Sequence, residues 1–239
     1  MDARQLAPGL WRWTAPHPEW RPEKERPGGW WRDVGCVFYE PRAGDGIVLI
    51  DPLAPPEPTE EAARFWRNLD RDVARVGRPV AVLLGNFYHE RSAQAVYDRY
   101  RERPGAMVWA HEAARYRLSC ELTHPFLPGQ RLPGGVEAHP VAGFEEAEIV
   151  YYIGEHQTLV FADAVIGVGH GQLRVAPRSW APANDAAAER YTQGFRRSLR
   201  ALLDLTVDKV LVSHGQSVLR DARQALAEAL DAPAWGEDS

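Results

Sequence analysis

The strongest constraint on the fold of this chain is a series of short apolar runs, each of which stops at polar residues in a turn. Runs of this length that are rich in β-branched residues and bounded by turn-forming residues are typical of buried β-strands. The runs span 47–50, 80–84, 158–161 and 210–212, and they stop at Asp51-Pro52, at Gly85-Asn86, near Asp163 and at Ser213-His214-Gly215.

Helical patterns lie between these runs. Apolar residues recur at helical spacing over 62–73 after Thr59, and similar patterns follow Ser92 and Asn184, which are residue types that cap helices. Strands that alternate with helices predict a layered α/β fold. Such folds place their functional sites where polar residues gather at the ends of buried strands, so we expect the site there.

Composition argues against several classes of partner. The chain has 239 residues, of which 45% are hydrophobic and 26% charged, as in a globular protein. A net charge of -5 argues against a nucleic acid as the main partner. No apolar run approaches the ~20 residues of a membrane helix, and no secretory signal opens the chain, so we expect no membrane partner and a cytoplasmic location. Cys36 and Cys120 follow no metal-binding spacing and are expected to be free thiols.

We expect residues 1–239 to form a single domain, with a surface loop over 17–29 and a disordered tail over 232–239. The loop is rich in Pro, Arg and Glu. Its tryptophans either pin the loop to the core, which we favour, or form a platform on which a ligand stacks. The tryptophans in or beside this loop are Trp11, Trp13, Trp20, Trp30 and Trp31.

The order of the strand ends resembles the metallo-β-lactamase superfamily across nearly the whole chain. The matching pieces are the opening strand at 10–13, the hairpin that ends in LIDP at 49–52, the segment 80–93 in the place of the HxHxDH motif, the region 151–164 and the SHG loop at 213–215. The resemblance implies a four-layer αβ/βα sandwich of two mixed β-sheets flanked by helices. In active members the HxHxDH motif holds one or two metal ions, which lower the pKa of a bound water.

The resemblance also implies that most of the metal ligands are replaced in this chain. Asn86 and Tyr88 stand where the first two motif histidines would be. Glu90 stands at the aspartate position and Arg91 at the last histidine position. His89 falls on a spacer position, although a shift of one residue in the alignment would move it onto a ligand position.

Outside the motif, two of the family's ligand positions keep their residue types. Asp163 matches the bridging aspartate and His214 the last histidine, whereas Phe144 stands where the family has a Gly-His ligand. Asp51 also matches, but the family uses it as a supporting residue and not as a ligand.

Arg91 bears most directly on metal binding, because a guanidinium keeps its proton and cannot ligate a cation. Two positive charges about 4 Å apart repel by roughly 4 kcal/mol at an effective dielectric of about 20. We therefore hypothesise that Arg91 occupies the vacated metal position and pairs with Asp163 and Glu90, whose carboxylates suit its planar fork. No metal is then expected; if one binds, its ligands would be Glu90, Asp163 and His214.

The candidate catalytic residues are Asp163, His214 and His89. His214 is either a base oriented by Asp163 or a residue that only fixes its loop. His89 is either an unorthodox ligand or base, or a surface or hydrogen-bonded loop histidine, which we favour. The candidate binding residues are Asn86, Tyr88, Glu90, Arg91 and Phe144; for Tyr88 we favour a packed side chain with a satisfied hydroxyl over a substrate donor.

Three functions follow, and whether the chain is an enzyme stays open. The first is a member of the fold that lacks ordinary dinuclear zinc activity, needs no cofactor and binds a small molecule or partner in the old cleft. The second is a hydrolase of esters, thioesters or lactams with a mononuclear zinc or iron site. The third is an interaction protein that uses its tryptophan-rich region as a contact surface. Fold resemblance alone does not select a substrate.

Overall fold

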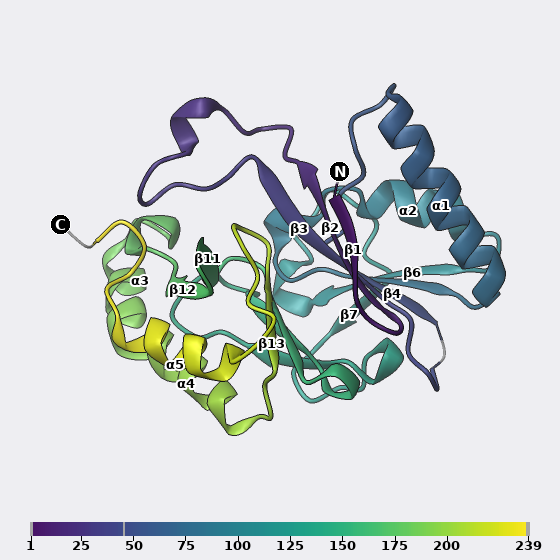
Figure 1. Ribbon diagram of the computed structural model, residues 1–239. Coiled ribbons are helices and arrows are strands. Elements are labelled where there is room, and N and C mark those ends of the chain that lie inside the picture. Colours follow the sequence, from purple (N-terminus) through teal and green to yellow (C-terminus); the bar gives the residue numbers. More distant parts are fainter. Residues whose placement is uncertain (1, 45, 238–239) are drawn as a thin grey trace.

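The computed structural model describes residues 2–44 and 46–237 and has two β-sheets packed face to face between helices (Figure 1). Among the described residues, seven strands form the first sheet in the order of the sequence. Strands β1 to β4 pair antiparallel, and β4 to β7 pair parallel. The strands are β1 (Asp2–Ala7), β2 (Leu10–Pro16), β3 (Asp33–Tyr39), β4 (Ile47–Ile50), β5 (Val80–Leu83), β6 (Ala106–His111) and β7 (His124–Phe126).

The second sheet has the order β13-β10-β9-β8, with β10 parallel to β13 and antiparallel to β9. A separate hairpin of β11 and β12 lies next to it. The sequence runs at 158–161 and 210–212 therefore become neighbouring parallel strands, so their polar ends lie at the same edge. The strands are β8 (Glu137–Pro140), β9 (Ile149–Ile153), β10 (Thr158–Phe161), β11 (Val165–Gly169), β12 (Gln172–Val175) and β13 (Lys209–Val212).

Helices cover the outer face of each sheet, which gives the predicted four layers. Figure 1 shows α1 and α2 on one side and α3, α4 and α5 on the other. In α1, the residues that are buried are the ones whose helical spacing predicted the helix, and Thr59 Oγ1 caps it by accepting from the backbone N–H of Ala62. The helices are α1 (Glu60–Val76), α2 (Ala93–Tyr100), α3 (Asp185–Arg190), α4 (Arg196–Arg200) and α5 (Ala222–Asp231).

Two of the expected helical segments differ in detail from their sequence prediction. Asn184 caps α3 as expected, but a π-helical turn, Tyr191–Phe195, interrupts the pattern before α4. Ser92 precedes α2 without capping it, because its hydroxyl instead accepts a hydrogen bond from the backbone N–H of Ala54. That bond ties the start of α2 to the loop after β4, beside the candidate site.

Alternation along the strands divides the core into layers. Val48 and Ile50 of β4 face the second sheet, whereas Ile47 and Leu49 face the helices. All four are buried, so β4 reads as a continuous apolar run instead of an alternating one. Truncating such a side chain to Ala costs about 2–5 kcal/mol.

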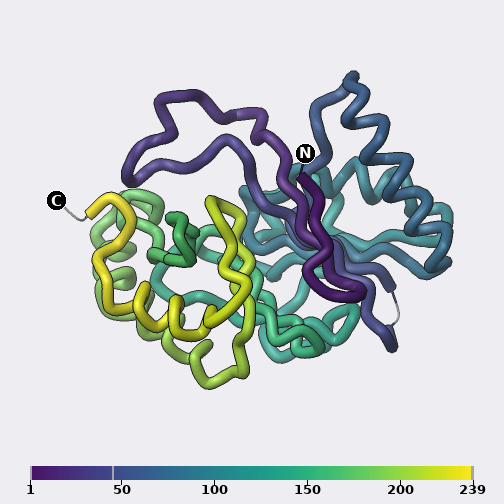
Figure 2. The backbone as a smooth tube through the Cα atoms, viewed as in Figure 1, coloured from purple at the N-terminus to yellow at the C-terminus, as the bar shows by residue number. Residues whose placement is uncertain are grey.

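The tail and the predicted surface loop contact each other. We expected a disordered tail over 232–239. In residues 232–237 the chain is instead ordered, because Ala234 is buried and the Trp235 ring stacks on Trp31. Residues 238–239 lie outside the described part. The Trp235 Nε1–H donates to the carbonyl of Gly29 at 2.9 Å. Figure 2 shows the loop between β2 and β3 as a broad purple arc on the same side of the molecule as the yellow C-terminal segment.

Within the described ranges, no helix is both long enough and apolar enough to cross a lipid bilayer.

Candidate functional site

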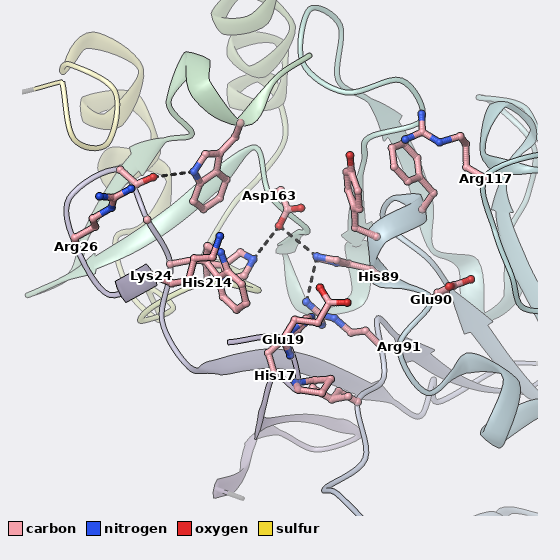
Figure 3. Close-up of a pocket in the computed structure, with 18 residues that line it drawn as sticks. His17, Glu19, Lys24, Arg26, His89, Glu90, Arg91, Arg117, Asp163 and His214 are labelled. Carbon is pink, nitrogen blue, oxygen red and sulfur yellow. Dashed lines mark hydrogen bonds and ion pairs between the residues drawn. The ribbon is translucent and has the colours of Figure 1, made fainter. Parts of the chain in front are cut away.

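Polar residues from four strand ends meet at one edge of the sandwich, as the sequence predicted. Three of these residues bring possible metal-binding atoms within 4.8 Å of one another: His89, Asp163 and His214. Asp163 Oδ1 lies 3.2 Å from His89 Nε2 and 3.1 Å from His214 Nε2 (Figure 3). Asp163 is therefore the centre of the cluster.

His89 is held in place by the turn that follows β5. The side chain of Asn86 caps this turn, Phe87–His89, by accepting from the Tyr88 N–H. The imidazole Nδ1 lies 2.8 Å from Asp51 Oδ2, which leaves Nε2 facing Asp163. A carboxylate on one imidazole nitrogen fixes the ring so that the other nitrogen can act, an arrangement common to metal-binding and catalytic histidines.

The charge state of His89 depends on opposing effects. Burial and the neighbouring Arg91 lower its pKa, but Asp163 and Asp51 outweigh them and raise the pKa to about 9. Because Arg91 can only donate, neutral His89 accepts from Arg91 at Nε2, whereas protonated His89 donates from Nε2 to Asp163. The two forms of the ring therefore select different partners.

Asp163 and Glu148 form the second part of the cluster. The Asn86 amide donates to Asp163 Oδ2 at 2.9 Å and to Glu148 Oε2 at 2.8 Å. Glu148 Oε1 accepts from the backbone N–H groups of Asp163 and Ala164. Burial and the charge of Asp163 raise the pKa of Glu148 to about 8, while burial of Asp163 is outweighed by His89 and His214, which lower its pKa well below the usual range.

His214 lies between two indole rings. Trp30 and Trp180 contact its imidazole edge-on, with ring centroids 5.4 and 5.6 Å away. Burial lowers the pKa of His214 despite the opposing effect of Asp163, so the ring favours its neutral form. Trp30, which was expected in or beside the surface loop, therefore also contacts the site.

Arg91 points into the cluster, but its partners differ from those we hypothesised. Its Nη2 lies 2.6 Å from Ser213 Oγ and 3.1 Å from His89 Nε2, and its Nη1 contacts the carbonyls of Gly35 and Asp51. The expected pairing with Asp163 and Glu90 is therefore corrected. The backbone of Arg91 has a positive φ of 36°, which turns the side chain in a direction that no sequence pattern reveals.

Glu90 and Phe144 also point elsewhere. The Glu90 carboxylate accepts from the backbone N–H groups of Ser119 and Cys120, so it braces a neighbouring loop and takes no part in the metal-capable group. Its expected place among the ligands is taken by His89. Phe144 is buried and stacks on Phe195 at 5.0 Å, so the ring belongs to the core and not to the pocket.

Tyr88 is 56% exposed, which corrects the expectation of a packed side chain. It lines a pocket of about 750 Å³ above the cluster, together with residues of the loop at 17–30. Trp180 donates its Nε1–H to the carbonyl of Gly28, which joins this loop to the segment that carries Trp180. Glu148, Lys24 and Arg117 belong to the site region although nothing in the sequence pointed to them.

The donor set fits one divalent ion, with one contact against it. Two imidazole nitrogens and a carboxylate oxygen are ligands that zinc and iron accept, and Asp163 Oδ1 is buried without an aligned hydrogen bond. His89 Nε2, however, has a single lone pair. That lone pair ligates an ion, accepts the hydrogen bond from Arg91 or carries a proton that is donated to Asp163, and it can do only one of these at a time.

No family model matches the chain, and no curated protein matches it by sequence. Solved structures do. A metallo-β-lactamase family protein from Thermus thermophilus has a TM-score of 0.61 and 17% identity, over 95% of this chain and 80% of that one. A β-lactamase domain protein from Burkholderia ambifaria has a TM-score of 0.63 and 14% identity, over 95% of this chain and 75% of that one. A metallo-β-lactamase from Pontibacter korlensis has a TM-score of 0.62 and 14% identity, over 97% of this chain and 99% of that one. At these identities the likeness establishes the architecture, so this chain has the metallo-β-lactamase fold.

Proposed function

We propose that this protein binds a small molecule in the pocket above Asp163, with Arg91 in place of the ordinary pair of zinc ions. One observation carries the proposal: Arg91 Nη2 lies 3.1 Å from His89 Nε2 and 2.6 Å from Ser213 Oγ. In the neutral ring the guanidinium takes up the imidazole lone pair that a metal ion would need, and in the protonated ring that lone pair already carries a proton.

Charge supports the proposal. Each unit of positive charge on an ion about 4 Å from the guanidinium costs about 4 kcal/mol at an effective dielectric of about 20. Arg91 already places a positive charge beside His89, where Asp51 and Asp163 place negative ones. An ion that displaced Arg91 would also leave the Ser213 hydroxyl and two carbonyls without their donor.

The part of the cluster formed by Asn86 and Glu148 also supports the proposal. Asn86 stands where the resemblance places a first histidine ligand, and its amide nitrogen donates to both Glu148 and Asp163. An amide N–H is a donor and not a ligand. A donor therefore faces these carboxylates at the position where a second ion would need a ligand.

Metal content tests the proposal. The protein is expressed in medium supplemented with zinc, iron and manganese, desalted, and measured by elemental analysis beside Arg91→His. We expect well under one ion per chain in the wild type and about one in Arg91→His, which exchanges the competing donor for an imidazole ligand. A tightly held, stoichiometric ion in the wild type would overturn the proposal.

A second candidate is a hydrolase with one metal ion, favoured by the convergence of His89, Asp163 and His214. Asp51 would orient His89 for ligation, and the bound ion would supply a water of lowered pKa. His89 replaces Glu90 in this ligand set. The candidate requires that Arg91 leave His89. It predicts chelator-sensitive hydrolysis of ester, thioester or lactam probes, and activity that survives the chelator would exclude it.

A further inference from the structure

We infer that the pocket takes an aromatic organic anion: a flat ring system that carries a carboxylate or a phosphate. The inference rests on the proposed function and names the class of its ligand. Two independent features of the pocket support it, namely unpaired cations around its mouth and aromatic side chains on its walls.

The first feature is a set of three cations at the mouth: Lys24, Arg26 and Arg117. Lys24 and Arg26 come from the loop on the His214 side, and Arg117 from the opposite side (Figure 3). For the part of the chain that the structure describes, none of the three has a carboxylate within 4.0 Å, although Arg117 is near enough to Glu145 to oppose the burial that raises the pKa of that carboxyl. Several arginines elsewhere on the surface are paired, as in Arg32–Asp33, Arg75–Glu40, Arg99–Asp70, Arg115–Glu112 and Arg200–Asp231, whereas others, such as Arg103 and Arg131, are scattered singly.

The acidic residues of the pocket do not cancel these cations. Glu90 is occupied by the backbone N–H groups of the 119–120 loop, and Asp163 is surrounded by Asn86 and the two imidazoles. Glu19 is then the one remaining acidic residue among those that line the pocket. In a chain of net charge -5, a pocket with this local excess of positive charge attracts anions.

The second feature is the aromatic lining. Trp30 and Trp180 form one wall beside His214, and Phe87 and Tyr88 form the other. Tyr88 remains 56% exposed although it adjoins apolar neighbours, so the fold itself does not cover its ring. Aromatic faces of this kind stack on flat ligands.

Arg117 connects the two features. Its guanidinium carbon lies over the Phe87 ring, 3.9 Å from the ring centroid, which holds the group against the aromatic wall. Its side-chain N–H groups donate to no residue in the described part of the chain, so they stay free for a carboxylate or phosphate. A ligand with a flat ring and an anionic end matches both surfaces at once.

Binding of naphthalene-2-carboxylate, compared with the neutral naphthalene-2-carboxamide, tests the inference. Both are titrated by calorimetry into chelator-treated protein. We expect the acid to bind about tenfold more tightly than the amide, and this ratio to shrink as salt is raised. Equal affinities, or no binding of the acid, would overturn the inference.

Variants test whether the three cations at the mouth cause the preference for the acid over the amide. We expect Lys24→Ala/Arg26→Ala and Arg117→Ala each to weaken acid binding about three- to tenfold while leaving amide binding nearly unchanged. Arg101→Ala removes an exposed arginine that is outside the pocket lining and should leave both affinities unchanged. An equal loss in the Arg101 variant would contradict the inference, because it would mean that net charge alone attracts the acid.

The result separates this inference from the proposed function. A stoichiometric ion in the wild type together with a clear preference for the acid would overturn the metal-free site and retain the ligand class. A metal-free protein with no preference for the acid would retain the metal-free site and overturn the ligand class.

Discussion

The two halves of the cluster around Asp163 use buried carboxylates in opposite ways. On the imidazole side, formed by Asp51, His89, His214 and Arg91, the groups can exchange protons and partners. On the amide side, formed by Asn86 and Glu148, every hydrogen bond has a fixed donor. The first half is suited to chemistry or ligand binding, and the second to holding Asp163 in place.

The pKa values follow the same division. Despite burial, the pKa of Asp163 is lowered by the two histidines, whereas burial and Asp163 itself raise the pKa of Glu148 to about 8. Neighbouring carboxylates with pKa values pushed apart are typical of functional sites, although structural networks also produce them. The comparison predicts that the amide side contributes mainly to stability.

The largest effect is therefore expected from Glu148→Ala. It leaves the Asn86 amide and two backbone N–H groups buried without their acceptor, so the free energy of unfolding should fall by about 3–5 kcal/mol. Urea unfolding measures this. Glu146→Ala, at an exposed position two residues away, serves as the control and should change stability by less than about 0.5 kcal/mol. A loss below about 1 kcal/mol for Glu148→Ala would show that the amide side is not structural.

A smaller loss is expected on the imidazole side from Arg91→Met. The variant removes the donor of Ser213 Oγ and of the carbonyls of Gly35 and Asp51, which should cost about 2–4 kcal/mol. The same denaturant titration applies, with Arg101→Met as the exposed counterpart. An unchanged or raised stability would mean that Arg91 opposes the fold instead of supporting it.

The pH dependence of stability should come next in size. Because folding raises the pKa of His89 from 6.5 to about 9, its contribution is complete below pH 6.5 and is lost as the pH rises through 9. Glu148, also raised, acts in the same direction. For metal-free protein we expect a fall of about 1–3 kcal/mol between pH 6.5 and 9, reduced in His89→Gln. Stability that rises over this range would contradict the assignment.

The smallest effect is expected from Ser213→Ala. Arg91 loses its shortest hydrogen bond but keeps two carbonyls and His89, so about 1 kcal/mol should be lost. Thermal unfolding is sensitive enough to detect it. A loss as large as that of Arg91→Met would indicate that Ser213 alone holds the guanidinium.

Sequence patterns predicted the architecture well because they follow from burial. The four apolar runs became strands β4, β5, β10 and β13, and their polar ends met at one edge, as parallel neighbours must. The buried face of α1 was likewise predicted from spacing alone. Cys36 and Cys120 are free thiols, as expected.

Side-chain direction at the site could not be read from the same patterns. His89 enters the cluster because the turn at Phe87–His89 is a tight helical one, and Arg91 turns inward at a positive φ. Glu148 was missed because an isolated glutamate before an apolar strand ordinarily faces solvent. Phe144 and Glu90 were placed by alignment to a motif, which fixes backbone position but not which atoms the side chain reaches.

The central claim is that the guanidinium of Arg91, 3.1 Å from His89 Nε2, excludes a metal ion from the cluster. Zinc titration of chelator-treated wild type and Arg91→Ala, against a chromophoric competitor, tests it most directly. We expect removal of the guanidinium to tighten zinc binding by at least about tenfold, in line with the repulsion it relieves. Nanomolar zinc binding by the wild type, unchanged in Arg91→Ala, would contradict the account.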